Sequence, residues 1–220
     1  MKFLTLLIFC ISMMPSCRAQ DNKVRNVAIF VHEGVQLLDF AGPGEVFAAA
    51  GSGYKVYTVA SSKDLVLSDR FVSIKPQYTL EDCPKPDIIV FPGGATEIPL
   101  RDEKVIQWVK SAGKDSEYLL SVCTGVFLLA KGGFLDGKTA TTHYCCQDGL
   151  ANDYPKINVV KGKRFIDNGH IITTEGISAG IDGSLYLISK ISGKEHADKI
   201  AKYIMYNWAL DQLDYTVVAN

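Results

Sequence analysis

The sequence lacks the features that mark several large classes of protein. Its 23 Lys and Arg residues are balanced by 24 Asp and Glu residues, and the basic residues form no run or stripe. Nucleic acid is therefore not an expected partner. A phosphate-binding loop and a dinucleotide fingerprint are both missing, and no group of His, Cys and Asp has the spacing of a metal site. We expect neither a cofactor nor a metal.

The chain also lacks the signs of a multidomain protein. No Gly/Ser linker, low-complexity tract or internal repeat divides the 220 residues, a length that suits one domain with a sizeable core. We expect this domain to cover residues 26–210, followed by a C-terminal tail over residues 211–220.

The N-terminus carries an apolar run that is too short to span a bilayer and has the shape of a signal-peptide core. The run follows Lys2 and ends at Pro15. Cleavage after Ala19 would define a signal peptide over residues 1–19. Alternatively, a loose lipoprotein box would define a signal over residues 1–16 and leave Cys17 as a lipidated first residue. Both routes predict an exported protein, periplasmic or held at a membrane through a lipid on Cys17.

Six cysteines fall to four once such a leader is removed: Cys83, Cys123, Cys145 and Cys146. An even number in an exported protein is compatible with disulfides, but a domain of this size does not need them. The adjacent pair of cysteines cannot bridge easily without strain. The redox state of the thiols stays open.

Short apolar runs alternate with helical patterns along the chain. Strands are predicted at VAIFV, YKVYTVA, RFVSIKP, PDIIVF, EYLLSV and KTATTHY, with a hairpin around Asn168-Gly169. Helices are predicted to begin at Pro43 and in DEKVIQWVKSAG, GVFLLAKGG, ISAGIDGSLYLISKISG and KEHADKIAKYIMYNWAL. This order predicts an α/β fold, in which helices cover both faces of a mostly parallel sheet and a small hairpin is added.

Ligands of such sheets bind at the carboxyl ends of the strands, and Cys123 stands at one of these ends. It lies between the strand pattern EYLLSV and the helix pattern GVFLLA. A strand-to-helix turn holds a nucleophile away from the backbone, and a helix N-terminus favours a thiolate. We interpret Cys123 as a functional thiol rather than a small core residue.

Two further loops end at the same edge. Gly93-Gly94 could direct backbone N–H groups at the sulfur and, with Thr124, form an oxyanion-type cradle, or could simply form a tight turn. Asp39 lies among apolar residues in VQLLDFAGP, where burial should raise its pKa and let it carry a proton. The alternative for Asp39 is a turn or capping acid. His143 could serve the thiol as a base or partner, or be structural.

Several of these motifs together resemble the DJ-1/PfpI family, whose fold is flavodoxin-like and related to class I glutamine amidotransferases. The resemblance is carried by VQLLDFAGPGEVF, DIIVFPGG, SVCTGVFLLA, GKTATTHY and TTEGISAGIDGSLYLI, and extends from about Val27 to Trp208. Within this family, the chain is similar to the isonitrile hydratase-like branch and to the related sensor domains of AraC-type regulators. This similarity is carried by Asp39, Gly42-Pro43 and Cys123-Thr124-Gly125.

The resemblance implies Cys123 as nucleophile, Asp39 as the neighbouring carboxyl group and Thr124 as a hydroxyl and amide contact. It also implies Gly93 and Gly94 in the anion cradle, a histidine near the cysteine at the position of His143, no cofactor, and a homodimer. A small electrophile is the expected substrate of a cysteine-dependent hydratase or lyase. The alternatives are a ligand-binding or redox-sensing module, and a glyoxalase-like enzyme that acts on 2-oxoaldehydes.

Overall fold

The computed structural model of the chain describes residues 23–219. The predicted signal peptide and Cys17 therefore lie outside the described residues. Within residues 23–219, no helix is both long and apolar enough to cross a membrane.

An eight-stranded sheet forms the centre of the molecule, in the order β12-β10-β11-β7-β6-β1-β2-β5. Its strands are β1 (Arg25–Phe30), β2 (Tyr54–Ala60), β5 (Tyr78–Thr79), β6 (Ile88–Phe91), β7 (Tyr118–Val122), β10 (Phe165–Asp167), β11 (Ile171–Thr174) and β12 (Tyr215–Val217). The strands from β11 to β5 are parallel, whereas β10 is antiparallel to β11 and parallel to β12. The predicted mostly parallel sheet with a hairpin around Asn168-Gly169 is thus confirmed.

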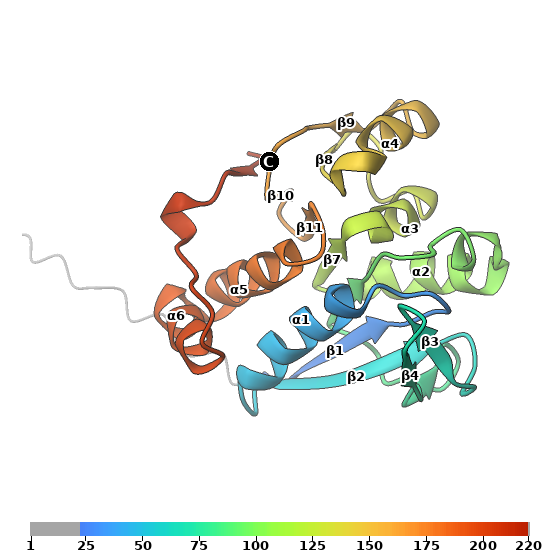
Figure 1. The fold of residues 1–220 in the computed structure, drawn as a ribbon, viewed down its shortest axis with the longest axis horizontal. Coiled ribbons are helices and arrows are strands. Elements are labelled where there is room, and N and C mark those ends of the chain that lie inside the picture. Colours follow the sequence, from blue (N-terminus) through green and yellow to red (C-terminus); the bar gives the residue numbers. More distant parts are fainter. Residues whose placement is uncertain (1–22, 220) are drawn as a thin grey trace, which may run out of the picture.

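Helices cover both faces of this sheet (Figure 1). They are α1 (Leu37–Ala49), α2 (Glu103–Asp115), α3 (Val126–Lys131), α4 (Gln147–Asp153), α5 (Ala179–Ser192) and α6 (Lys194–Tyr203). Two small sheets lie outside the centre, one antiparallel from β3 (Val66–Ser68) and β4 (Val72–Ile74), the other parallel from β8 (Thr139–Ala140) and β9 (Asn158–Val159). Short 3₁₀ turns are η1 (Pro99–Arg101), η2 (Cys123–Gly125), η3 (Tyr144–Cys146) and η4 (Leu210–Gln212).

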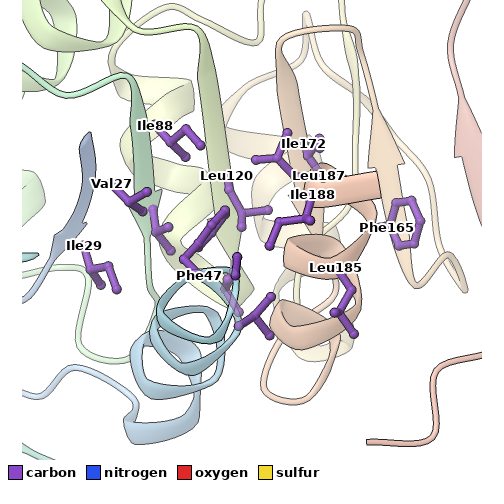
Figure 2. Close-up of a cluster of buried hydrophobic side chains, with 14 of the residues drawn as sticks. Val27, Ile29, Phe47, Ile88, Leu120, Phe165, Ile172, Leu185, Leu187 and Ile188 are labelled. Atoms are coloured by element: carbon purple, nitrogen blue, oxygen red, sulfur yellow. The ribbon is translucent and has the colours of Figure 1, made fainter. Parts of the chain in front are cut away.

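The residues of β1 show why both faces are covered. Val27 and Ile29 belong to one buried cluster, together with Phe47 of α1 and residues of α5 and α6. Their neighbours Ala28 and Phe30 belong to a second cluster, with residues of α2 and α3. Because successive side chains of a strand point to opposite faces, an uninterrupted apolar run requires a core on each side. Figure 2 shows the first cluster between the strands and the helices α1 and α5.

Helix α1 begins six residues before the predicted start at Pro43, and it runs through this proline. A residue far along the chain supplies its N-terminal cap. One carboxylate oxygen of Asp69 accepts hydrogen bonds from the Leu37 N–H (2.8 Å) and from the Gln36 side chain (2.9 Å). Unpaired N–H groups at a helix start need such an acceptor. The consequence is that Asp39 lies in the first turn of a helix rather than in a loop.

The C-terminal region also differs from the prediction. Helix α6 ends at Tyr203, where Met205 adopts a left-handed φ of 54° and the Tyr206 N–H bonds to the Ala201 carbonyl (2.8 Å). The described part of the predicted tail, residues 211–219, is not separate from the domain, because β12 pairs with β10 at the edge of the central sheet. The ring of Tyr215 stacks on that of Phe165, with centroids 4.6 Å apart, and this contact holds the last strand to the domain.

Candidate active site

Four neighbouring strands of the sheet deliver the candidate site residues to one edge. Helix α1 follows β1 and carries Asp39, the Gly93-Gly94 turn follows β6, and Cys123 follows β7. The segment Gly176-Ile177 follows β11, which lies beside β7 in the sheet. Carboxyl ends of parallel strands meet at one edge, and this is where ligands bind in open α/β sheets.

Cys123 occupies a sharp, strained turn. Its φ is +55°, a left-handed value that costs free energy for a residue with a Cβ, and its side chain is 7 % exposed. Gly125 allows the turn to lie against β6, because a Cβ at this position would sit 1.8 Å from the Phe91 carbonyl oxygen. Strand, strained cysteine and helix together form the predicted nucleophile-elbow geometry.

Asp39 is fully buried beside the thiol. One carboxylate oxygen accepts the Gly93 N–H at 3.0 Å, and the other accepts the Ile177 N–H at 2.9 Å. The Cys123 thiol lies within hydrogen-bonding reach of the same carboxylate. Both oxygens are thus fixed in orientation, and the acid is held where it can exchange a proton with the sulfur.

The two groups shift each other's pKa in a way that corrects the prediction of a resting thiolate. Burial, and secondly the charge of Asp39, raise the pKa of Cys123 to about 12, although the Thr124 N–H and hydroxyl act in the opposite direction. Burial raises the pKa of Asp39 to about 6, while its bonds to Gly93, Ile177 and Cys123 limit the rise. At neutral pH the pair therefore holds one proton, and this proton resides mainly on sulfur.

The Gly93-Gly94 turn plays a different part from the predicted anion cradle. The Gly93 N–H is already bonded to Asp39, and the Gly94 N–H is bonded to the Thr124 hydroxyl at 3.1 Å. The glycines are needed for close approach, since a Cβ on Gly93 would lie 2.6 Å from the Thr124 hydroxyl and 2.9 Å from Cβ of Cys123. The turn orients Asp39 and Thr124 rather than offering unused donors.

Thr124 links the elbow to this turn. Its hydroxyl accepts the Gly94 N–H and donates to the Gly94 carbonyl at 3.2 Å. A side chain that does both with one residue fixes the distance between β6 and β7 at their carboxyl ends. We therefore assign Thr124 the role of positioning the elbow against the glycine turn. Its contact with a substrate stays a prediction.

The ring of His143 contacts Cys145 and Tyr144, and its partnership with Cys123 stays a prediction. Its Nδ1 atom is 2.9 Å from the sulfur of Cys145, which in turn is 3.5 Å from the sulfur of Cys146. The three ligand-type atoms all lie within 4.8 Å of one another. The prediction that no such group has metal-ligand spacing is wrong here, because the turn at η3 gathers side chains that the linear spacing did not suggest.

All four cysteines of the described part, Cys83, Cys123, Cys145 and Cys146, are free thiols. Cys83 and the adjacent pair have separate surroundings. Cys83 packs against the second core cluster, whereas Cys145 and Cys146 lie on the turn beside His143.

Sequence reasoning missed two contributors to the site. Ile177, with a left-handed φ of 51°, presents its N–H to Asp39, and Gly176 lies so close that a Cβ there would be 3.2 Å from the Cys123 sulfur. A signal was present, because the parallel strand β11 ends directly before them, as β6 and β7 end before the predicted residues.

A flavodoxin-like α/β sheet with a cysteine at a nucleophile elbow and a buried acid beside it defines a recognisable class of protein. Residues 25–190 match the DJ-1/PfpI family, and the chain belongs to this family. The resemblance stated from the sequence motifs is thereby confirmed.

Within the family, the chain is similar to proteins of different function. It is 36% identical over 174 residues to isonitrile hydratase of Pseudomonas putida, covering 78% of this chain and 74% of that protein. It is 28% identical over 149 residues to the HTH-type transcriptional regulator CdhR of Pseudomonas aeruginosa, covering 68% of this chain but only 44% of the regulator. A crystal structure of a THiJ/PfpI family protein from Pseudomonas syringae superimposes with a TM-score of 0.79 at 28% identity, covering 90% of this chain and 81% of that one.

Proposed function

We propose that this protein is a cofactor-free enzyme in which the Cys123 thiol adds to a small electrophile, with an isonitrile as the favoured substrate class. The observation that carries the proposal is the buried thiol–carboxyl pair, which holds one transferable proton at neutral pH. The similarity to isonitrile hydratase over most of both chains supports the choice of substrate.

The pair can perform the addition without another group. As the sulfur attacks the terminal carbon of R–N≡C, its proton passes to Asp39, which then delivers it to the same carbon. The product is a thioimidate, R–N=CH–S–Cys123. Water then adds to this carbon, the C–S bond breaks, and the proton returns to sulfur. The released product is the N-substituted formamide R–NH–CHO, so that one isonitrile and one water are consumed.

Orientation of Asp39 is the protein's main contribution to this sequence. Two backbone N–H groups each donate a hydrogen bond to one of its carboxylate oxygens. These two bonds can be kept while the carboxyl group gains or loses a proton on the side that faces Cys123. Proton transfer requires such a fixed distance between donor and acceptor. The strain at Cys123 serves the same end, since it projects the sulfur from the turn.

The test is turnover by the full chain with a panel of alkyl and aryl isonitriles, followed as formamide formation. Cys123→Ala should lower kcat/KM by roughly a thousandfold or more, whereas Cys83→Ser, which removes a thiol far along the chain, should leave it unchanged. Full activity in Cys123→Ala overturns the mechanism. An arm with 2-oxoaldehydes tests the glyoxalase-like alternative on the same thiol.

The match to a transcriptional regulator favours a second candidate, a module that binds a small ligand without converting it. The chain spans about half the length of the regulators it matches. Saturable binding of isonitriles or aldehydes without product, unchanged in Cys123→Ala, would support this candidate. Redox sensing through Cys123 is less well supported, because a thiol with a raised pKa reacts slowly with peroxide.

We further propose that the protein is exported and forms a homodimer. Lys2 and the apolar run before Pro15 support export, as a periplasmic protein or one anchored through Cys17. Cell fractionation with the intact mass of the mature chain distinguishes cleavage after Ala19 from lipidation at Cys17. Light scattering of the purified protein gives the mass in solution, and a monomer at all concentrations contradicts the dimer.

A further inference from the structure

A turn beside the elbow gathers three side chains that are not used by the thiol–carboxyl pair. His143 is followed by the 3₁₀ turn η3, in which the Cys146 N–H bonds to the His143 carbonyl at 2.8 Å. This bond closes a loop of four residues and brings the first and the last side chain together. Cys145 lies between them, with its sulfur 2.9 Å from Nδ1 of His143 and 3.5 Å from the sulfur of Cys146.

From this arrangement we propose that His143, Cys145 and Cys146 form a binding site for a thiophilic d¹⁰ cation, with Zn²⁺ or Cu⁺ as the ions of matching chemistry. The proposal is independent of the hydratase reaction, in which none of these residues was given a chemical step. Imidazole and thiolate are the ligands that both ions prefer, and two sulfurs with one nitrogen leave a further position open on a tetrahedral ion.

The distances suit such an ion. Zn–S bonds of about 2.3 Å and a Zn–N bond of about 2.0 Å in tetrahedral geometry separate the two sulfurs by roughly 3.8 Å and nitrogen from sulfur by roughly 3.5 Å. The cysteine pair is already near this separation, and the His143–Cys145 pair must open by less than 1 Å, about the reach of a small side-chain rotation. Cys145 is exposed, so that an ion can enter from solvent.

The surroundings hold the backbone of this turn in place. On one side the buried Thr142 donates its hydroxyl to the Cys123 carbonyl at 2.7 Å. On the other, the buried Gln147 side chain donates to the Thr142 carbonyl at 3.1 Å. Ligands on a fixed turn lose little freedom when an ion binds, and this favours affinity. The same bonds place the site next to the elbow that carries Cys123.

Affinity for the ion itself is the test. The full chain, freed of metal with a chelator and kept reduced, is titrated with Zn²⁺ against a chromophoric chelator. Co²⁺ is used in parallel, because sulfur-to-cobalt charge-transfer absorption reports thiolate ligands. We expect one Zn²⁺ per chain at this site, loss of the charge-transfer band in Cys145→Ser and in Cys146→Ser, and an affinity lowered by about a hundredfold or more in either variant.

Matched variants keep the proposal open to refutation. Cys83→Ser and Cys123→Ser should retain wild-type affinity, and every variant keeps Cys10 and Cys17, so that binding there would be common to the set. Far-ultraviolet circular dichroism checks that the serine variants are folded. Equal affinity of wild type, Cys145→Ser and Cys146→Ser overturns the site, as does a loss of binding that follows Cys123→Ser instead.

Discussion

At the scale of single residues, the proton shared by Cys123 and Asp39 determines how the site should respond to pH. Asp39 must be ionised to accept the thiol proton, and burial raises its pKa to about 6. We therefore expect log(kcat/KM) to be flat above this pH and to fall below it with unit slope, as one proton binds to the carboxylate. A decline on the alkaline side should be absent over the ordinary range, because the pKa of Cys123 is raised to about 12.

The Asp39→Asn variant separates two effects of Asp39: its charge, which raises the pKa of Cys123, and its ability to carry a proton. Removing the negative charge should lower the pKa of Cys123, so that iodoacetamide alkylates it faster than in the wild type at mildly alkaline pH. Turnover should nevertheless fall, because the amide cannot carry the proton. Alkylation of Cys83 in the same sample is the internal control. Slower alkylation of Cys123 in the variant would contradict the assigned interaction between the two groups.

At the scale of secondary-structure elements, the contact between η2 and β6 depends on a missing side chain. A Cβ on Gly125 would lie 1.8 Å from the Phe91 carbonyl oxygen and 2.6 Å from its carbonyl carbon. Since backbone cannot yield as a flexible side chain does, Gly125→Ala should lower the free energy of unfolding by about 3 kcal/mol or more. Urea denaturation monitored by circular dichroism measures the change.

Gly149→Ala is the matched control for this substitution. Gly149 lies inside helix α4, is exposed, and has no atom within 4 Å of an added Cβ. Alanine is the better helix former by about 0.5–1 kcal/mol, and so this variant should be as stable as the wild type or slightly more stable. Similar losses in both variants would show that the close approach at Gly125 is not the cause.

The same scale shows how far local sequence patterns predict the structure. Apolar runs such as VAIFV and the turn at Asn168-Gly169 carry their own local signal, and both strands and hairpin occur as predicted. The start of α1 has no such local signal, because its N-terminal cap comes from Asp69, 32 residues beyond Leu37. The sheet pairing of Tyr215–Val217 likewise depends on a distant partner strand.

In the candidate site, too, some features could be predicted from local patterns and others could not. Cys123, Asp39, Thr124 and the glycine turn could be predicted, because each follows or begins an element with a clear pattern. Their roles in the geometry could not, since a backbone N–H has no residue type and the donors to Asp39 come from Gly93 and Ile177. The cluster at His143 was missed because its members converge only through a 3₁₀ turn.

At the scale of the whole molecule, an ion pair between the partly exposed Lys190 and the buried carboxylate of Asp167 joins the β10–β11 hairpin to helix α5. The Lys190 ammonium group lies 2.9 and 2.8 Å from the two carboxylate oxygens of Asp167, whose side chain is only 2% exposed. Tyr186 also donates its hydroxyl to this carboxylate at 2.8 Å. The pair thus fixes the hairpin, and with it β11 and the loop that supplies Ile177, against the rest of the domain.

Removing one partner should therefore cost far more than the loss of an exposed pair. Lys190→Met leaves the Asp167 carboxylate buried without its counter-charge, and we expect the free energy of unfolding to fall by about 3 kcal/mol. Lys199→Met, which breaks the exposed pair with Glu195, should cost about 0.5 kcal/mol or less. Adding Asp167→Asn to Lys190→Met should recover part of the loss, because it removes the unpaired charge. Equal losses for the two lysine variants, or a further loss in the double variant, would mean that packing rather than the buried charge governs this contact.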